Sequence, residues 1–404
     1  MSMATDPPAR MPEASASSEQ GALTRAMTDL GGPALGRPLR GWWTCFAVAV
    51  SALAVGVVAV TYQLRTGIGT WGLNRSVGWA YDITNFVFWI GVGHAGTLIS
   101  AILLLFRQRW RVGVSRAAET MTIIAIVCAA IFPVIHLGRP WLMLWVLPLP
   151  NARGPLWVNF SSPLTWDVFA ILTYFVVSLL FWYLGLLPDF ASLSHAATGW
   201  RRRVFGLLSL GWNGSLRTWA LYERTCLLLA GLATALVISV HSVVSFDFAA
   251  SLVPGWHTTI FPPYFVVGAI FSGMAMVLAL LVVMRRAMAL QSYVTLQQLD
   301  AMCKIMLATS GLLGLAYLIE TLTALYGNHG PDRFMLMLRM QGPLAAYYWA
   351  MIACNVLVPQ LLWSGRVRRN LPLVFAIALL ALAGMWLERF LIIVGSLQRD
   401  FLPS

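Results

Sequence analysis

Nine long apolar segments constrain the fold of this chain more than any other feature. They lie at about 42–64, 81–106, 117–138, 164–187, 222–246, 260–284, 298–326, 342–363 and 371–395. A helix needs ~20 apolar residues to cross a bilayer. Hydrocarbon offers no partner to backbone polar groups, so only helices and closed barrels span it. Segments this long and uniformly apolar predict an all-α, polytopic transmembrane helix bundle of about nine spans.

Composition supports the same class. The chain is 59% hydrophobic and only 10% charged, whereas soluble globular domains carry about 25% charged residues. A formal charge of +12 could indicate a nucleic-acid partner, but the arginines lie in short clusters between the apolar segments. Membrane topology explains that pattern, so we expect the lipid bilayer as a partner and no nucleic acid.

The basic clusters also predict orientation. Every second loop is strongly basic: Arg107, Arg109, Arg111 and Arg116; Arg201, Arg202, Arg203 and Arg217; Arg285 and Arg286; Arg366, Arg368 and Arg369. Basic loops stay in the cytoplasm, so we expect a multi-pass protein of the cytoplasmic membrane with its N-terminus inside. Residues 1–40 are rich in Ala, Ser, Pro and Gly and predict a disordered cytoplasmic tail. Residues 200–212 predict an amphipathic helix on the inner surface.

A weak internal repeat indicates two related four-helix bundles within residues 41–404. The spans at 81–187 and 260–363 begin about 180 residues apart. The fourth and eighth spans open alike, with Pro163, Leu164 and Asp167 against Pro343, Leu344 and Tyr347. Internal repeats give such an offset in many membrane proteins, although nine spans could also show it by chance.

The five cysteines give no metal motif. Cys45, Cys128, Cys226, Cys303 and Cys354 each lie singly in or beside an apolar segment. None has the spacing of a zinc site, an iron–sulfur site or a c-type haem attachment. We therefore expect no metal, no iron–sulfur cluster and no c-type haem in this chain.

The segment 131–167 holds the strongest candidate site. It closes one apolar helix with His136 and opens the next with Asp167, so the two are expected to face each other outside the membrane. Pro133 should kink the first helix and open a wedge. An imidazole and a carboxylate there can take protons from a lipid-soluble hydroxyl compound. Alternatively, His136 bonds a carbonyl at the rim, and Asp167 caps its helix.

Other ionisable residues in or near the spans each have a functional and a structural interpretation. Arg139 could bind a headgroup, although anchoring at the interface is favoured. His94, between small residues in mid-span, could relay protons, ligate a haem or make a buried hydrogen bond. We disfavour haem because His241, the other span histidine, is expected near the outer end of its helix. His257 lies in a stiff outer loop that suits a docking partner.

The acidic residues could line a proton path or neutralise neighbouring charges. Glu320 and Glu388 fall in the outer parts of their spans, and Glu119 and Glu223 fall near inner ends. Glu223 adjoins Arg224, and Glu388 adjoins Arg389, so local charge pairing is the alternative for these two.

Several long runs resemble a known family. They are FVFWIGVGHAGTLISAIL, RAAETMT, FPVIHLGRPW, YERTCLLLAGLAT, SVHSVVSFDF, PGWHTTIFPPYFVVGAIFSGMAMV and ERFLIIV. Over residues 70–403 the chain is similar to the NrfD/PsrC-type quinone-interacting membrane subunits, and most closely to ActC, a membrane component of bacterial alternative complex III. The family pattern has ten spans, so the resemblance implies a further helix beyond Ser404.

The resemblance implies a function. Such a subunit has no redox cofactor of its own and oxidises menaquinol or ubiquinol near the periplasmic face. Electrons pass to a periplasmic iron–sulfur subunit and then to c-type haem subunits, and a paralogous NrfD-like subunit lies alongside in the membrane. By motif, the quinol site falls on His136 and Asp167, and a candidate proton path falls on His94 and the acidic residues.

Two alternatives stay open at this point. The same site could work in reverse, in the quinone-reducing anchor of a molybdopterin or polysulfide-type oxidoreductase. A different class, a transporter or structural anchor without redox function, predicts no quinone at this site. The residues do not settle which quinone is used, the direction of electron flow, or whether protons are pumped.

Overall fold

A computed structural model describes residues 31–32, 35–36, 40–73, 77–146, 162–327 and 329–398. Nine helices within these residues are long and apolar enough to cross a membrane, as the sequence predicted. Most of the predicted N-terminal tail and much of the loop before Asp167 lie outside the described residues. The all-α fold class is confirmed, and we regard the chain as a multi-pass membrane protein.

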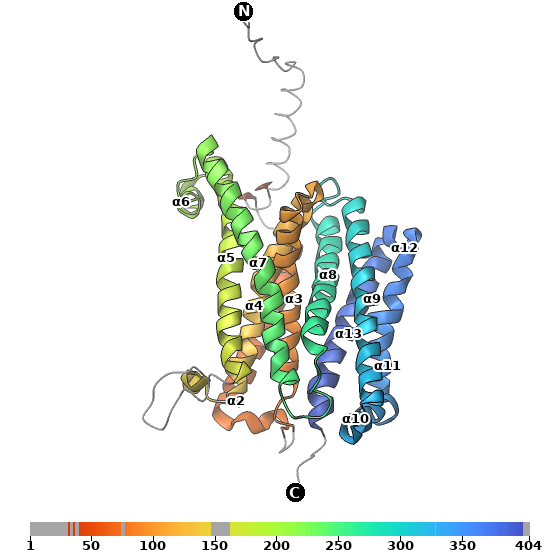
Figure 1. The fold of residues 1–404 in the computed structure, drawn as a ribbon. Coiled ribbons are helices and arrows are strands. Elements are labelled where there is room, and N and C mark those ends of the chain that lie inside the picture. Colours follow the sequence, from red (N-terminus) through yellow and green to blue (C-terminus); the bar gives the residue numbers. More distant parts are fainter. Residues whose placement is uncertain are drawn as a thin grey trace, which may run out of the picture. The chain divides into compact units, whose positions relative to one another are not determined.

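Within the larger unit, the long helices follow one another in a nearly regular up-and-down order (Figure 1). The spanning helices are α2 (Arg40–Thr66), α3 (Tyr81–Leu105), α4 (Val112–His136), α5 (Pro163–Ala196), α7 (Leu216–Ala249), α8 (Phe261–Ala287), α9 (Leu296–Tyr326), α11 (Ala345–Ile352, continued as a helix to Trp363) and α13 (Leu371–Leu397). Shorter helices are α6 (Gly199–Leu208), α10 (Gly330–Gln341) and α12 (Gly365–Arg369).

The chain divides into two compact units. The smaller contains residues up to Ala59 together with Gly185–Ala220, and the larger contains Val60–Leu184 and Leu221–Ser404. In the smaller unit, α6 is the amphipathic helix that the sequence predicted within 200–212, and Phe190 of α5 stacks on Phe205. The larger unit holds every residue discussed below.

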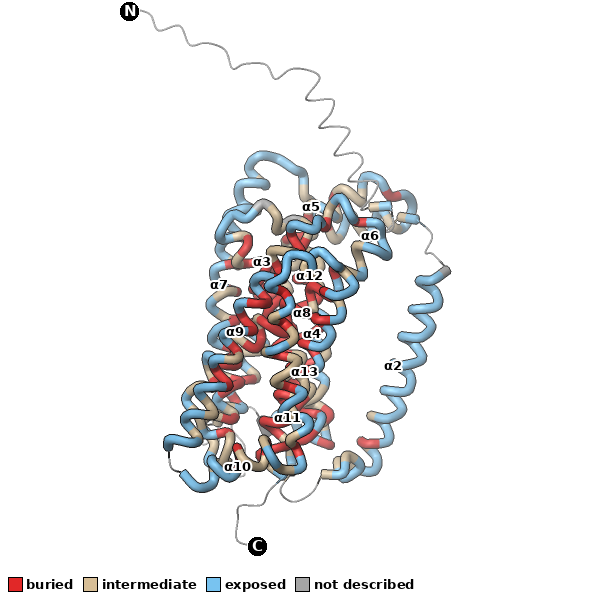
Figure 2. Tube along the Cα trace, turned by 90° about the vertical axis from the view of Figure 1, so that its right-hand side faces the viewer, coloured by how far each residue is buried: buried red, intermediate tan, exposed pale blue. Residues whose placement is uncertain are grey.

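The core of the larger unit is centred on α3 and α8, which are buried along most of their length (Figure 2). Small residues allow this close packing. A Cβ on Gly96 would lie 2.2 Å from the carbonyl oxygen of Ala118 in α4, and a Cβ on Gly273 in α8 would lie 1.9 Å from the Cβ of Ala95. Such contacts are typical of helix pairs in lipid, where apolar surface gives little driving force and tight packing replaces it.

The larger unit has two chemically different ends. At one end α4 and α7 finish and α3 and α5 begin; this is the lower end in Figure 1, and we call it the His136 end. The opposite end, which we call the arginine end, carries Arg107, Arg111, Arg285, Arg286, Arg366, Arg368 and Arg369. Which end faces the cytoplasm stays a prediction, as does the relation between the two halves of the repeat.

The eighth span departs from a regular helix. After α11 the chain forms a π-helical turn at Ala353–Leu357 and then a 3₁₀ segment at Val358–Trp363. The π turn places Asn355 against Gly384 of α13, where a Cβ would lie 2.2 Å from the amide oxygen. Such turns often occur at functional positions, and this one brings the Asn355 amide to a buried glutamate described below.

Candidate functional site

His136, the last residue of α4, pairs with a carboxylate that the sequence analysis did not single out. Its Nδ1 hydrogen-bonds Oδ2 of Asp82, in the first turn of α3. The other oxygen of Asp82 accepts the backbone N–H groups of Ala80 (3.1 Å) and Ile83 (2.8 Å). Because the carboxylate is fully buried and held by three groups, it fixes the orientation of the imidazole. With Nδ1–H donating to Asp82, Nε2 is the basic nitrogen.

Asp167 therefore has a different partner from the one that the sequence suggested. Its carboxyl group interacts with that of Asp247, in the last turn of α7. Asp167 is 5% exposed. Apart from the Asp247 carboxyl group, no described residue offers a hydrogen-bond donor to either oxygen of Asp167. The sequence analysis paired His136 with Asp167; the structure instead shows a His136–Asp82 pair and an Asp167–Asp247 pair. Two carboxyl groups this close can hold one proton between them.

An apolar groove of about 410 Å³ is formed by α4 and α5, the helices that carry His136 and Asp167. It lies between α4 and α5 and is lined by Ile126, Val127, Ala130, Ile131, Val134, Ile135, Ile171, Leu172 and Phe175. Ile135 directly precedes His136, and Ile171 lies one helical turn beyond Asp167. The groove is therefore wide and apolar enough to hold an apolar chain alongside the last turns of α4 and the first turns of α5.

The end of α4 is held in place by a hydrogen bond from another helix and by the turn that follows it. Pro133 lies inside the helix and removes one backbone donor. The carbonyl of Ile135 accepts a hydrogen bond from the Gln63 amide at 2.6 Å, and Gly138 turns the chain with φ 65°. Arg139, just beyond, has an exposed side chain, which suits the interfacial anchor that the sequence favoured.

We call α3 to α7 the first half of the larger unit. Deeper in this half, His94 contacts a second buried histidine, His241. The rings of His94 and His241 lie 4.3 Å apart, edge to face, and Tyr174 lies 4.1 Å from His94. The expectation that His241 sits at a different depth was wrong, because α7 extends to Ala249. Direct ring contact leaves no place for a flat haem between the two imidazoles. His94 Nε2 and His241 Nδ1 are buried and have no hydrogen-bond partner among the described residues.

Glu119 is buried between α3 and α4, nearer the arginine end. Ser100 donates a hydrogen bond to Oε1, and the guanidinium of Arg116 lies 3.5 Å from Oε2. Between Glu119 and His94, the hydroxyl of Thr122 donates to the carbonyl of Gly93 at 2.7 Å and accepts from the N–H of Thr97 at 2.8 Å. Polar groups thus continue along the α3–α4 contact.

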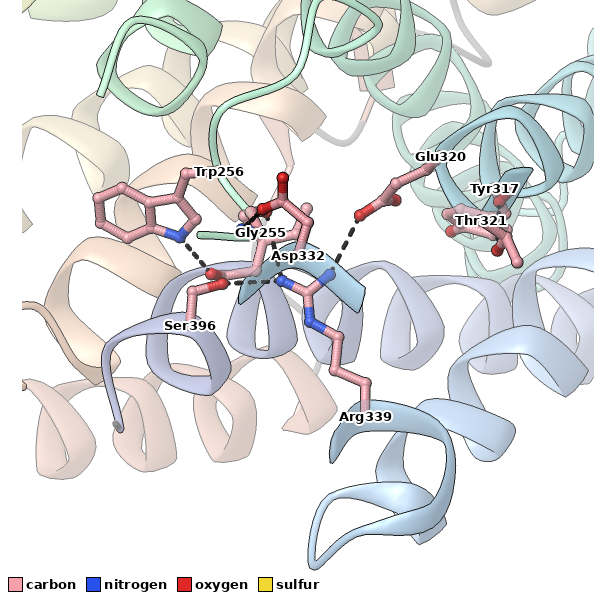
Figure 3. Close-up of polar contacts among 9 residues, drawn as sticks. Gly255, Trp256, Tyr317, Glu320, Thr321, Asp332, Arg339 and Ser396 are labelled. Carbon is pink, nitrogen blue, oxygen red and sulfur yellow. Dashed lines mark hydrogen bonds and ion pairs between the residues drawn. The ribbon is translucent and has the colours of Figure 1, made fainter. Parts of the chain in front are cut away.

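In the second half of the larger unit, which runs from α8 to α13, Glu388 and Glu320 each pair with an arginine. Glu388 lies 2.8 Å from Arg389 and accepts a hydrogen bond from Tyr317, whose hydroxyl also accepts from Asn355 at 2.8 Å. Glu320 of α9 is bound by Arg339 of α10 at 3.1 Å (Figure 3). Glu223 differs from both because its side chain is exposed.

Metal ligation has no geometric support in the described part of the chain. No group of three or more His, Cys, Asp or Glu side chains there could hold an ion. The described cysteines are free thiols, and Cys226 and Cys303 are buried among apolar side chains.

Comparison with known proteins gives the family. Residues 70–399 match the family model described as polysulphide reductase, NrfD, which covers most of the chain. The chain therefore belongs to the NrfD family of oxidoreductase membrane subunits.

Two individual proteins are similar to this chain at low sequence identity. A protein of Halobacterium salinarum, named as a candidate membrane subunit of dimethyl sulfoxide reductase, is 25% identical over 365 residues, which is 89% of this chain and 78% of the relative. The Hdr-like menaquinol oxidoreductase integral membrane subunit of Archaeoglobus fulgidus is 24% identical over 238 residues, 56% of this chain and 49% of that protein. Closeness to the ActC protein of alternative complex III in particular is not shown by these matches.

Proposed function

We propose that this chain is the quinol-oxidising membrane subunit of a respiratory complex, with its reaction site at the His136 end. The carrying observation is the imidazole of His136, oriented by Asp82 at the end of α4, the helix that also forms one side of the apolar groove. A quinol has a flat ring with two hydroxyl groups and a long apolar tail. The groove between α4 and α5 suits the tail, and the polar ends of α3, α4, α5 and α7 suit the ring.

Oxidation of a quinol releases two protons and two electrons. Nε2 of His136 accepts the first proton, and Asp82 stabilises the imidazolium that forms, as a carboxylate behind a general base does. The second proton passes to the Asp167–Asp247 pair. Asp82 thus takes the orienting role for which the sequence suggested Asp167. Arg139 is an anchor at the rim of this site.

The electrons leave to another chain of the complex. We place there a periplasmic iron–sulfur subunit, followed by c-type haem subunits and a paralogous NrfD-like membrane subunit, as in alternative complex III. This assignment puts the His136 end on the periplasmic side of a bacterial cytoplasmic membrane. The arginine end then lies in the cytoplasm, which agrees with the preference of basic loops for that side.

Buried polar groups in the first half support a proton route toward the arginine end. Glu119 and Ser100 form its inner part, Thr97 and Thr122 continue it, and His94 with His241 forms its centre. Glu320 on α9 and Glu388 on α13 lie outside the α3–α4 contact that carries these groups, and Glu223 is exposed. These three stay outside the proposed route, and the sequence-based prediction for them stays untested.

The reverse reaction is the second candidate. The relative from Halobacterium salinarum is named after dimethyl sulfoxide reductase, a name that favours a quinone-linked reductase. The same residues serve that direction, because His136 and the carboxyl pair would then supply protons to a quinone. The potential of the partner's redox centre decides between the two directions.

Replacement of His136 tests the proposal. In the purified complex, His136→Gln keeps a side chain of similar reach but removes the base. We expect quinol-dependent electron transfer to fall roughly 100-fold or more, the effect typical of losing a general base. His329→Gln is the matched control, since this exposed histidine pairs with Asp332 outside the proposed site. Wild-type turnover in an assembled His136→Gln complex would exclude the proposed role.

A further inference from the structure

A cavity in the second half of the chain has no part in the proposed reaction. It measures about 530 Å³, within the range of about 300–1,000 Å³ typical of small-molecule sites. It opens among α7, α8, α9, α10 and the loop before α8, all within the larger unit. Phe246, Pro262, Met335 and Leu336 form apolar walls, and His257, Glu320 and Arg339 are the main polar groups.

Arg339 is fixed by the groups around it. Its Nη1 donates to Glu320 at 3.1 Å, and its Nη2 donates to Ser396 at 2.8 Å and to the carbonyl of Gly255 at 3.4 Å (Figure 3). The arginine side chain is 8% exposed. The neighbouring loop is also held, because Gly255 N–H donates to Asp332 at 3.2 Å and the indole of Trp256 donates to the carbonyl of Ile392. The cavity is therefore preformed.

Two acceptors remain for a ligand. Glu320 uses Oε1 to accept from Arg339, whereas Oε2 accepts no hydrogen bond among the described residues, and its side chain is 23% exposed. His257 uses Nδ1 toward the carbonyl of Ser251 at 3.0 Å. That bond requires Nδ1–H to donate, so Nε2 is left as an acceptor. A ligand with two hydroxyl donors satisfies both groups.

The charges argue against an anion. Glu320 and Asp332 both line the cavity, and the one guanidinium there already binds a carboxylate. A phosphate headgroup or a polysulphide ion would lie beside two like charges with no uncommitted cation among the described lining residues, which is unfavourable. A neutral, flat ring with two hydroxyl groups fits the apolar walls and the two acceptors.

We infer that this cavity is a second quinol-binding site, which binds a quinol without oxidising it. The inference shares with the proposed function the assumption that the chain meets quinol, but it rests on different residues. No electron or proton transfer is part of it. Its occupancy would let one chain hold two quinol molecules, one at the His136 end of the first half and one in the second half.

Photolabelling of the intact complex in lipid tests the inference. The probe is a short-chain quinol with an azido substituent, and labelled peptides are located by mass spectrometry. We expect two labelled regions in the wild-type chain: one in residues 126–136 or 163–175, and another in residues 246–262 or 320–339. Absence of label from the second region would overturn the inference.

Three variants separate the two sites. Ala324→Trp fills the second cavity from its wall and should reduce label there at least tenfold while the first region stays labelled. Leu322→Trp is the matched control, because Leu322 is 54% exposed on the same helix and does not line the cavity; both labels should persist. Ala130→Trp fills the α4–α5 groove and should remove only the first label.

The outcomes distinguish this inference from the proposed function. Equal labelling of residues 246–262 and 320–339 in Ala324→Trp and the wild type would contradict the second site. Label in the second region alone, in the wild-type chain, would support the second site and contradict quinol binding at the His136 end.

Discussion

The two halves of the larger unit treat their buried acids differently. In the second half, Glu388 carries Arg389 and Glu320 carries Arg339. At the His136 end of the first half, Asp82 faces an imidazole and Asp167 faces another carboxyl group, whereas Glu119, nearer the arginine end, lies 3.5 Å from Arg116. Charged side chains in a membrane are costly unless paired. An acid held by a fixed guanidinium is stabilised in place, whereas an acid beside a titratable group can exchange a proton with it.

This difference explains why the reaction is placed in the first half. The helices that form the apolar groove, α4 and α5, also carry His136 and Asp167, which can change protonation. The cavity of the second half leads to groups that are already neutralised, and there we infer binding alone. Removing a charged side chain is therefore expected to have different effects in the two halves. In the second half it should lower stability, and in the first half it should lower turnover.

The largest effect is expected from Arg389. The Arg389 guanidinium lies over the ring of Phe265 at 4.2 Å and is 2% exposed. Arg389→Met leaves Glu388 buried without its cation. Removing one partner of a buried ion pair destabilises water-soluble proteins by about 3–5 kcal/mol. We expect a loss of that order, measured as a lower thermal midpoint of the complex in mild detergent.

A double variant isolates the charge from the packing. Glu388→Gln combined with Arg389→Met removes both charges and should recover most of the lost stability, because an apolar replacement of a buried pair is often neutral. Equal destabilisation in the single and double variants would show that the guanidinium matters for its volume, and the comparison between the halves would lose its basis.

A smaller effect, on turnover, is expected from the carboxyl pair. Asp167→Asn removes one acceptor of the second proton and should slow quinol oxidation by about 100-fold. Asp247→Asn should act in the same direction, and the double variant should be little slower than the slower single variant, because the pair holds one proton. Steady-state rates in the lipid-embedded complex measure this.

The matched control is an acid at the arginine end. Asp300 is paired with Lys304 at 2.7 Å and with Arg368 at 2.6 Å, so Asp300→Asn should keep turnover close to the wild type. If Asp167→Asn and Asp247→Asn were both as fast as Asp300→Asn, the proton would be leaving by groups other than this pair.

The fold was largely predictable because hydropathy alone decides it. Each apolar segment of ~20 residues appears as a helix, and the bounds differ from the prediction by only a few residues in most cases. The prediction missed α10, which is short and amphipathic, and the π turn at Ala353–Leu357. The α10 helix has no long apolar run, and the π turn lies inside an apolar segment whose hydropathy does not distinguish a π turn from an α-helix.

The candidate site was predictable only in part. Proline before a histidine at a helix end marked His136, but its partner comes from the start of another helix. Judged by its position in the sequence alone, Asp82 looks like an acidic residue that stabilises the first turn of α3. Asp247, Arg339 and His241 gain their roles from packing between helices far apart in sequence. Which acid meets which base is a tertiary property, and a single sequence without co-varying relatives does not contain it.

The most direct test of the account is a double-mutant cycle between His136 and Asp82, measured as the rate of quinol oxidation. If Asp82 acts by orienting the imidazole, Asp82→Asn slows the wild-type complex but has almost no effect in the His136→Gln background. If Asp82→Asn slows both backgrounds by the same factor, the two residues act independently, and the claim that an oriented imidazole is the base fails.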